Sequence, residues 1–392
     1  MANKNLSSAK RAKNDEFYTQ YEDINREVQA YLEYDPDVFR GKTVYCNCDD
    51  PYTSNFFKFF ALHFNDFGLK RLIAASYDPS PIAGTQLPFE EIAGMQGSDK
   101  KAYVFDATEM PSLNKGGTVD LDDTKRLMQT VKEVVRPLQG NGDFRSVECI
   151  ELLKQSDIVV TNPPFSLFRE YISQLVEYGK QFLIIGNMNA ITYKEVFPLI
   201  KKNKVWLGVD SGAKNYIVPP GLETERGNIA KAADGTCFAK MGNTCWFTNL
   251  EHGRRHQPLS LMTVADNLKY SRHKEIRGKA AYDKYDNYDA IEVPYTDAIP
   301  SDYDGVMGVP ISFLEKYCPE QFEIVGTSDN GIIDDTYKTT QGLTQKFVDD
   351  YYRAGGKGAY QQGNPTAGLY VNGIATMIYK RIFIRYKKGE KA

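Results

Sequence analysis

The residues whose types and spacing indicate chemistry most directly are Asn162, Pro163, Pro164 and Phe165, which follow an apolar run. An exocyclic amine is a poor nucleophile because its lone pair is conjugated into the ring. An asparagine oxygen and the next carbonyl oxygen can accept hydrogen bonds from both amine protons, which favours the tetrahedral nitrogen that attack requires. Two prolines fix the direction of these oxygens, and an aromatic ring offers a face for stacking on a base. The pattern predicts a site that acts on an exocyclic amine.

A strand and a helix must position this motif. Residues 156–161 are predicted to form a buried strand, and the apolar spacing of residues 167–178 predicts an amphipathic helix. Ligands of open α/β sheets bind at the carboxyl edge of the strands, which is where the motif is then expected. The alternative is a loop with a Pro-Pro kink and no chemistry, which the flanking strand and helix disfavour.

Strands and helices alternate on both sides of the motif, which predicts an α/β fold with a mostly parallel sheet and helices on both faces. Asp50 and Pro51 have the types of an N-cap and a first helical residue, so a helix with four buried phenylalanines is expected to start there. Residues 78–142 are rich in Gly, Pro, Ser and Thr and are expected to be an insertion. Further strands are predicted at residues 43–48, 69–77, 102–105, 182–185 and 205–209, and further helices around residues 124–135 and 193–201.

The sequence texture changes after about residue 250. A helix from Pro310, a strand at residues 322–325 and a hairpin turn at Asn372-Gly373 are predicted. The last strand, residues 379–387, is expected to have one basic face. The predicted domains are a basic arm at residues 1–14, a catalytic domain at 15–250 with an insertion at about 80–140, and a C-terminal recognition region at 251–392. The arm is either a disordered tail or a phosphate contact.

Composition limits the classes of protein that fit. The chain has 392 residues, of which 42% are hydrophobic and 25% are charged, so two or three compact units are expected. The formal net charge is -3, so the whole protein has no positive electrostatic field that would attract DNA or an anionic membrane. Affinity for nucleic acid must therefore come from local patches of basic residues. No apolar run is long enough to span a membrane and the start lacks a signal-peptide core, so a cytoplasmic location is expected. The 6 cysteines are expected to be free thiols.

Metal binding is not expected. Cys46 and Cys48 share one side of a predicted strand, but buried thiols are the favoured interpretation unless a further ligand joins them. The four histidines have no metal-ligand spacing; they are His63, His252, His256 and His273.

Seven sequence blocks, in the same order, resemble the EcoRI-type DNA adenine-N6 methyltransferases. The resemblance covers nearly the whole chain and is weak at about residues 78–140, 210–240 and 330–365. The blocks are DEFYTQ at 15–20, VYCNCDDP at 44–51, GDFRS at 142–146, SDIVVTNPPFSLF at 156–168, ITYKEVF at 191–197, KYDNYDAI at 284–291 and YDGVMGVPISFL at 303–314.

This resemblance implies a fold and an activity. The expected fold is a Rossmann-like S-adenosylmethionine methyltransferase sheet with a C-terminal α+β DNA-recognition region. The implied cofactor is S-adenosylmethionine, which becomes S-adenosylhomocysteine, and no metal is implied. The implied reaction is direct in-line methylation of N6 of an adenine that is flipped out of duplex DNA at a specific site. The enzyme is expected to act beside a restriction endonuclease that cuts the same site without forming a stable complex with it, or to be an orphan, encoded by a bacterium or a phage.

The resemblance also implies roles for individual residues. Segment 15–20 is expected to pack on the methionine part of the cofactor, and the loop after the first strand is expected to bind the cofactor although it lacks the glycines of many relatives. The start of the following helix is a physical substitute for those glycines. The implied catalytic residues are Asn162, Pro163, Pro164 and Phe165, and the implied cofactor residues are Phe17, Tyr18, Thr19, Asp49, Asp50, Asp143 and Phe144, with Asp78 as a candidate for the ribose hydroxyls.

Structural alternatives exist for several of these residues. Phe17 and Tyr18 fit core aromatic residues equally well. Asp49 and Asp50 fit a pure capping role, and Asp143 fits a helix cap or a turn.

Basic residues of the C-terminal region are expected to fix the DNA backbone. The segment 268–284 carries six basic residues and only two acidic ones, interleaved with Tyr270 and Tyr282. The alternatives are a solvated face for this segment and protection of an exposed sheet edge for the last strand. The candidates are Arg254, Arg255, Lys269, Arg272, Lys274, Arg277, Arg381 and Arg385.

Two other functions remain open at this stage. Methyltransferases that act on protein glutamine also use Asn-Pro-Pro-aromatic at this sheet edge, although the basic arm and the large C-terminal region favour DNA. A DNA-binding protein that has lost cofactor use is the third hypothesis, and the intact motif argues against it.

Overall fold

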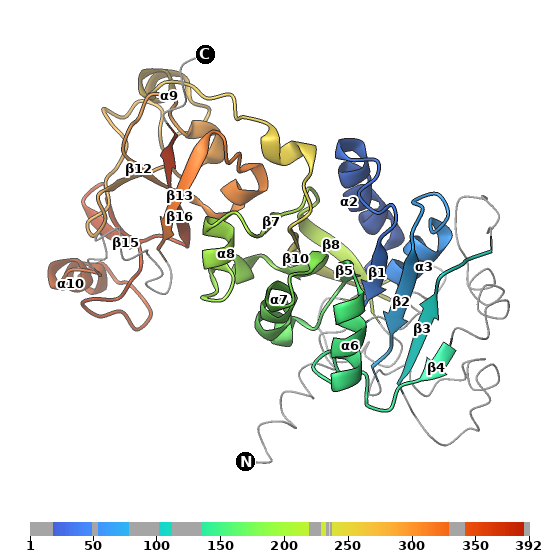
Figure 1. Cartoon of the computed structure of the whole chain (residues 1–392). Coiled ribbons are helices and arrows are strands. Elements are labelled where there is room, and N and C mark those ends of the chain that lie inside the picture. The colour runs from blue at the N-terminus through green and yellow to red at the C-terminus, as the bar shows by residue number, and fades with distance from the viewer. Residues whose placement is uncertain are drawn as a thin grey trace. The chain divides into compact units, whose positions relative to one another are not determined.

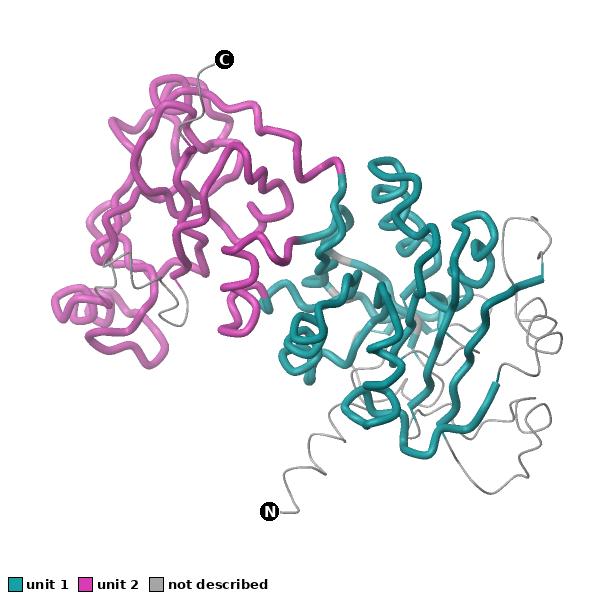
Figure 2. The backbone as a smooth tube through the Cα atoms, in the orientation of Figure 1, with its two compact units in different colours: residues 1–190, 207–252 teal, residues 191–206, 253–392 magenta. Residues whose placement is uncertain are grey.

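The structure is a computed structural model of the chain. It describes residues 19–48, 54–77, 102–111, 135–218, 229–232, 235, 237–328 and 342–387. The chain forms two compact units (Figure 2): unit 1 comprises residues 1–190 and 207–252, and unit 2 comprises residues 191–206 and 253–392. None of the helices in the described ranges is both long enough and apolar enough to span a membrane.

Within the described residues, a mixed sheet of ten strands is the frame of unit 1 (Figure 1). The strand order is β4-β3-β2-β1-β5-β6-β10-β7, and β8 and β9 also pair with β10. Strands β2, β1, β5 and β6 are parallel, as predicted, whereas β3 and β10 run antiparallel to their neighbours. The strands are β1 (Thr43–Cys46), β2 (Arg71–Ala75), β3 (Tyr103–Ala107), β4 (Val135–Pro137), β5 (Ile158–Thr161), β6 (Gln181–Asn187), β7 (Trp206–Leu207), β8 (Gly212–Ile217), β9 (Ile229–Lys231) and β10 (Cys237–Thr248).

Helices cover both faces of this sheet. Helices α2 (Tyr21–Tyr34) and α3 (Asn55–Leu62) bury Val28 and Phe60 in one core with Val44 of β1. Side chains alternate along a strand, so the next residue, Tyr45, points to the other face. That face is covered by α6 (Val147–Gln155) and α7 (Phe168–Glu177), whose Phe168 ring lies 5.0 Å from the ring of Phe247 in β10. The predicted α/β arrangement is confirmed in this coarse form.

The predicted start of helix α3 is wrong. The helix begins at Asn55 rather than at Pro51, and Ser54 is its N-cap. The Ser54 hydroxyl accepts hydrogen bonds from the backbone N–H groups of Phe56 (3.1 Å) and Phe57 (3.4 Å). A cap of this kind satisfies the first free donors of the helix, so no acidic residue is needed for that purpose. The four phenylalanines of the helix are buried, as predicted.

The described part of unit 2 contains a four-stranded sheet and a two-stranded hairpin. The sheet order is β11-β12-β16-β13, with β11 (Ala290–Glu292), β12 (Val306–Pro310), β13 (Phe322–Thr327) and β16 (Arg381–Tyr386). The hairpin of β14 (Gly368–Val371) and β15 (Ile374–Met377) turns at Asn372 and Gly373, whose φ angles are 49° and 79°. Positive φ at both turn residues is the geometry that an Asn-Gly pair favours, so this predicted hairpin is confirmed.

Helices of unit 2 are short. In the ranges that the structure describes, the α-helices of this unit are α8 (Phe197–Lys201), α9 (Val264–Tyr270) and α10 (Gln345–Arg353). The helix expected from Pro310 is a 3-10 helix that spans Ile311–Lys316, and the helix expected from residue 193 begins only at Phe197.

The predicted basic face of the last strand is closed at Arg381 and Phe383 and accessible only toward its end, at Arg385 and Lys387. Strand β16 is a central strand, paired with β12 on one side and β13 on the other. Phe383 is buried, and the Arg381 side chain is 12% exposed and paired with Glu292. The hypothesis that these arginines protect a sheet edge is therefore wrong, because the strand is not at an edge.

Candidate active site at the carboxyl edge of the sheet

The Asn162–Phe165 motif leaves the sheet at the carboxyl end of β5. Strand β5 lies beside β1 in parallel register, with Val159 opposite Tyr45. Thr161, the last residue of β5, donates a hydrogen bond from its hydroxyl to the backbone oxygen of Asn47, which follows β1. The predicted strand and the predicted helix on either side of the motif are both present. The motif therefore lies next to the end of β1.

The motif itself is partly enclosed. The side-chain oxygen of Asn162 is buried, and Pro163 is buried. Phe165 begins a 3-10 turn, Phe165–Leu167, that runs into helix α7, and its ring is partly buried against the core of unit 1. Asn162 and Pro163 thus lie in a turn between a central strand and a helix, which is the placement expected from the sequence.

Asn47 is a site residue that the sequence analysis missed. It follows the last residue of β1 and is fully buried. Its Oδ1 accepts a hydrogen bond from Cys48 N at 2.9 Å, and Cys48 has a left-handed backbone with φ of 64°. Among the described residues, no hydrogen-bond partner lies within reach of Asn47 Nδ2. A polar residue directly after a predicted buried strand is the sequence signal that could have identified this position.

Thr19 lies at the start of helix α3. Its backbone oxygen accepts a hydrogen bond from Asn55 Nδ2 at 2.7 Å. Its hydroxyl is buried and, within the part of the chain that is described, has no hydrogen-bond partner. An unsatisfied buried donor costs about 1 to 3 kcal/mol, so a ligand that accepts from it gains accordingly. Of the other candidates, Phe17, Tyr18, Asp49, Asp50 and Asp78 lie outside the described residues.

The loop after β4 brings Asp143 toward the end of β2. Gly142 has a φ of 73°, and a Cβ there would stand 1.9 Å from the backbone oxygen of Ser76, so only glycine fits. The Asp143 carboxylate accepts hydrogen bonds from Arg145 Nε at 2.9 Å and from Arg145 Nη2 at 2.7 Å. Burial acts to raise the pKa of Asp143, but the hydrogen bonds from Arg145 outweigh it and the pKa is below its ordinary value. Asp143 is therefore an ionised acceptor.

Phe144 is a core residue in this structure. Its side chain is buried, and its ring meets the ring of Tyr171 edge-on at 5.0 Å. Gln174 Nε2 donates a hydrogen bond to the Phe144 backbone oxygen at 3.2 Å. Phe144 fixes the loop to helix α7, so any contribution to a ligand site comes through the position of Asp143.

Two of the predicted DNA-binding residues are held inside unit 2. Arg255 is 6% exposed, lies 4.0 Å above the Trp206 ring and donates to Asn203 Oδ1 at 3.0 Å. Arg381 donates to both carboxylate oxygens of Glu292, at 2.7 to 3.1 Å. The structure does not support phosphate contacts by these two residues, because their guanidinium groups are already used in internal contacts.

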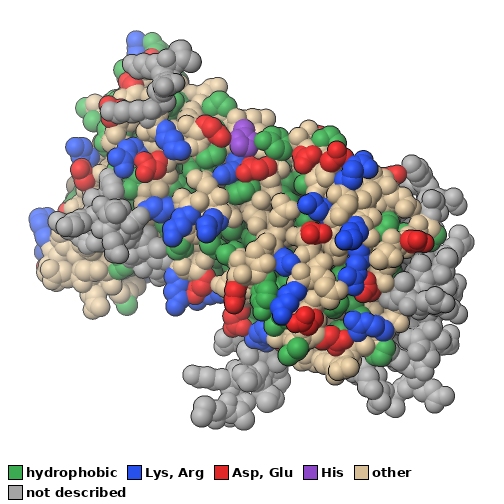
Figure 3. Space-filling view, in the orientation of Figure 1, with side chains coloured by type: hydrophobic (Ala, Val, Ile, Leu, Met, Phe, Trp, Pro, Cys, Tyr) green, Lys and Arg blue, Asp and Glu red, His purple; other side chains and the backbone are tan. Residues whose placement is uncertain are grey.

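The other predicted basic residues are more accessible. Arg272 is 78% exposed and forms an ion pair with Asp297 at 2.9 Å, and Arg385 is 42% exposed and lies 3.8 Å from Glu323. Arg254 is partly buried. On the face drawn in Figure 3, Lys and Arg side chains alternate with Asp and Glu side chains, which agrees with the small net charge. We call the exposed residues around helix α9 the basic segment; they are Lys269, Arg272, Lys274 and Arg277.

Cysteine and metal predictions can be compared with the structure. All six cysteines are free thiols, as predicted. Within the described ranges, no group of three or more His, Cys, Asp or Glu side chains is placed to hold a metal ion.

Comparisons with known proteins agree with the seven sequence blocks. The family described as "Adenine-specific methyltransferase EcoRI" matches residues 5–387. Type II methyltransferase M.EcoRI of Escherichia coli is 46% identical over 327 residues, which are 82% of this chain and 89% of that protein. Type II methyltransferase M.MpnI of Mycoplasma pneumoniae is 38% identical over 345 residues, 85% of this chain and 89% of that protein. Type II methyltransferase M.MgeORF184P of Mycoplasma genitalium is 36% identical over 338 residues, 85% of this chain and 90% of that protein.

Proposed function

The chain belongs to the EcoRI family of adenine-specific methyltransferases, and we propose that Asn162 and Pro163 are the groups that act on the amine of the target adenine. It is a DNA adenine methyltransferase of the kind that serves restriction-modification systems. The observation that carries the proposal is the placement of Asn162 directly after β5, at the carboxyl edge and beside the end of β1.

The chemistry of the motif follows from its atoms. Asn162 Oδ1 and the Pro163 carbonyl oxygen accept hydrogen bonds from the two protons of the adenine amine. These bonds favour a tetrahedral nitrogen and stabilise the positive charge that develops on it during attack. Phe165 supports the base by stacking. A neutral amide cannot take up the released proton, so that proton leaves to solvent.

Cofactor binding fits the end of β1. The methyl donor of this family, S-adenosylmethionine, supplies an electrophilic methyl group when it is bound. Thr19 Oγ1 and Asn47 Nδ2 are buried donors that lack partners among the described residues, and both suit the carboxylate of the methionine part. Asp143 is ionised, and a carboxylate has lone pairs beyond those that Arg145 occupies, so it suits the amine of the cofactor's adenine.

Duplex DNA is the substrate in this proposal. The target adenine must leave the stack at a cost of about a few kcal/mol before it can reach Asn162. The basic segment of unit 2 supplies exposed charges for the phosphates. Unit 2 and the insertion at about residues 80–140 recognise the base sequence. A restriction endonuclease that acts on the same site, without a stable complex, is the expected partner. The proposed location of the activity is the bacterial cytoplasm, where the DNA substrate lies.

One incubation tests this function. The purified protein is mixed with labelled S-adenosylmethionine and unmethylated genomic DNA, and the nucleosides and the modified sequence contexts are then determined. We expect the label in N6-methyladenine, at one sequence context. Label in protein glutamine, with no label in DNA, would overturn the proposal and support the glutamine methyltransferase alternative.

A further inference from the structure

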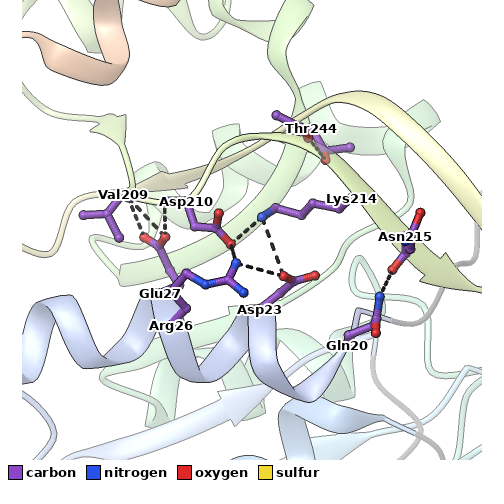
Figure 4. A network of polar contacts seen from close by, with 10 residues as sticks. Gln20, Asp23, Arg26, Glu27, Val209, Asp210, Lys214, Asn215 and Thr244 are labelled. Atoms are coloured by element: carbon purple, nitrogen blue, oxygen red, sulfur yellow. Dashed lines mark hydrogen bonds and ion pairs between the residues drawn. The ribbon is translucent and has the colours of Figure 1, made fainter.

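A polar network joins the start of helix α2 to strand β8 within unit 1 (Figure 4). Lys214 of β8 has a side chain that is only 5% exposed. Its Nζ binds the carboxylate of Asp210, which precedes the strand, and lies 4.0 Å from Oδ1 of Asp23 in the first turn of α2. A buried lysine thus stands between carboxylates from two separate elements.

Arg26 closes the same network from the outside. Its Nη1 lies 3.2 Å from Asp23 Oδ1 and 3.0 Å from Asp210 Oδ2. Asp23 and Asp210 are each 14% exposed, whereas Arg26 is 59% exposed. The pKa of Asp23 is raised above its ordinary value, chiefly by burial and also by the neighbouring Asp210, although Lys214 and Arg26 act to lower it. The network contains two acidic and two basic side chains. Of the two basic ones, Lys214 is less exposed to solvent than Arg26.

Hydrogen bonds on both sides extend this attachment along α2. Glu27, one turn further on, accepts hydrogen bonds from Val209 N at 3.1 Å and Asp210 N at 2.8 Å. A Cβ at Gly208 would stand 2.0 Å from Glu27 Oε1, so the approach requires glycine. At the other end, Gln20 Nε2 donates to the backbone oxygen of Asn215 at 2.5 Å. Figure 4 shows these contacts arriving from one side of the helix.

The segment fixed in this way leads directly into the cofactor region. Thr19 precedes Gln20, and its backbone oxygen is held by Asn55 at the start of α3. Thr19 and Gln20 are therefore fixed from two sides, by α3 and by β8. The direction of the Thr19 hydroxyl, which has no hydrogen-bond partner among the described residues, depends on both attachments.

We propose that Lys214 is a positioning residue for cofactor binding: by holding Asp23 and Asp210 together, it fixes the first turn of α2 and the Thr19 hydroxyl that precedes it. This inference rests on the proposed function, because it takes Thr19 to contact the methionine part of S-adenosylmethionine. Without Lys214, two carboxylates that are mostly buried face each other with Arg26 alone between them. Their repulsion moves the turn and weakens the cofactor contact.

Lys180 provides a matched control. It is a partly buried lysine of the same unit, and its Nζ donates to the backbone oxygens of Lys154 at 2.9 Å and Ser156 at 2.7 Å. Ser156 precedes β5, so Lys180 acts at the amino edge of the sheet, opposite the motif. Lys180→Met removes a partly buried lysine and its hydrogen bonds without touching the cofactor edge.

The test measures S-adenosylmethionine affinity by calorimetry on the full chain, and kcat and KM with duplex DNA. For Lys214→Met we expect the cofactor Kd to rise at least about tenfold, with kcat at saturating cofactor changed less than about threefold. Lys214→Arg, which keeps the charge, should restore most of the affinity. The double variant Asp23→Asn/Lys214→Met removes one charge of each sign and should bind more tightly than Lys214→Met alone.

Three results separate the possible failures. A cofactor Kd for Lys214→Met equal to that of the unmodified protein overturns the inference. An equal rise in Kd for Lys180→Met also overturns it, because the effect then reflects general loss of stability. If the unmodified protein itself does not bind S-adenosylmethionine, the proposed function fails and this inference fails with it.

Discussion

The hydroxyl of Thr161, at the end of β5, donates a hydrogen bond to the backbone oxygen of Asn47, directly after β1. This bond joins the strand that precedes Asn162–Phe165, the proposed catalytic motif, to the strand whose end borders the proposed cofactor site. Both residues are fully buried, so the bond is shielded from water. The Thr161 side chain therefore adds a connection between β1 and β5 beyond the pairing of the two strands.

Removal of that hydroxyl should lower both stability and activity. Thr161→Val keeps the shape but leaves the Asn47 oxygen without its donor, which costs about 1 to 3 kcal/mol of unfolding free energy. We also expect kcat/KM to fall, because Asn162 directly follows the altered residue. Urea unfolding and steady-state methylation check both effects. Thr161→Ser keeps the hydroxyl and is the control; equal losses in both variants would contradict the role of the bond.

Removal of the Asn162 amide should stop methyl transfer without releasing the cofactor. Asn162→Ala eliminates one of the two oxygens that accept the amine protons, so we expect a loss of roughly 100-fold or more in kcat. Cofactor affinity should not change, since Asn162 acts on the base. Single-turnover methylation and calorimetry measure the two quantities on the same preparation. Full activity of Asn162→Ala would exclude the proposed mechanism.

Glu27 should make stability depend on pH. Burial raises the pKa of Glu27 from 4.5 to about 7, although hydrogen bonds from Tyr31 and the 209–210 backbone oppose the rise. The folded protein therefore holds this proton more tightly than the unfolded chain does. The stabilising contribution is complete below pH 4.5, declines as pH rises through about 7, and totals roughly 3 kcal/mol across that range.

Urea unfolding at several pH values between 5 and 8 measures this effect. We expect Glu27→Gln to lose most of the decline, because the glutamine does not titrate. Glu33→Gln, an exposed position of the same helix, is the control and should keep the decline of the unmodified protein. Identical pH profiles for Glu27→Gln and the unmodified protein would show that Glu27 has an ordinary pKa.

Charge removal in the basic segment should weaken DNA binding in a salt-dependent way. Lys269 and Lys274 are exposed, and the double variant Lys269→Gln/Lys274→Gln should reduce the slope of log K against log salt by about 2 if each contacts one phosphate. The loss should be similar for specific and nonspecific duplexes, because phosphate contacts carry no sequence information. Fluorescence anisotropy at several salt concentrations measures the slope. An unchanged slope would place the DNA interface elsewhere.

The sequence by itself determined the features that depend on near neighbours in the chain. The strand, Asn-Pro-Pro-Phe turn and helix around Asn162 are encoded by apolar spacing and proline within about a dozen residues. The turn at Asn372 and Gly373 needs only the backbone preferences of those two residues. Seven ordered blocks were enough to indicate the family that the comparisons show.

Tertiary structure alone decided which residues from distant parts of the chain meet. From the sequence, Arg381 is a candidate for DNA binding. Only the structure shows that β16 is a central strand and that Arg381 pairs with Glu292. Lys214 likewise meets Asp23 only because strand β8 reaches the start of α2. Local propensity and periodicity do not specify strand order or the partner of a charged side chain. Burial of a charge depends on the packing of whole elements, and that packing decides whether a basic residue contacts solvent, DNA or a buried carboxylate.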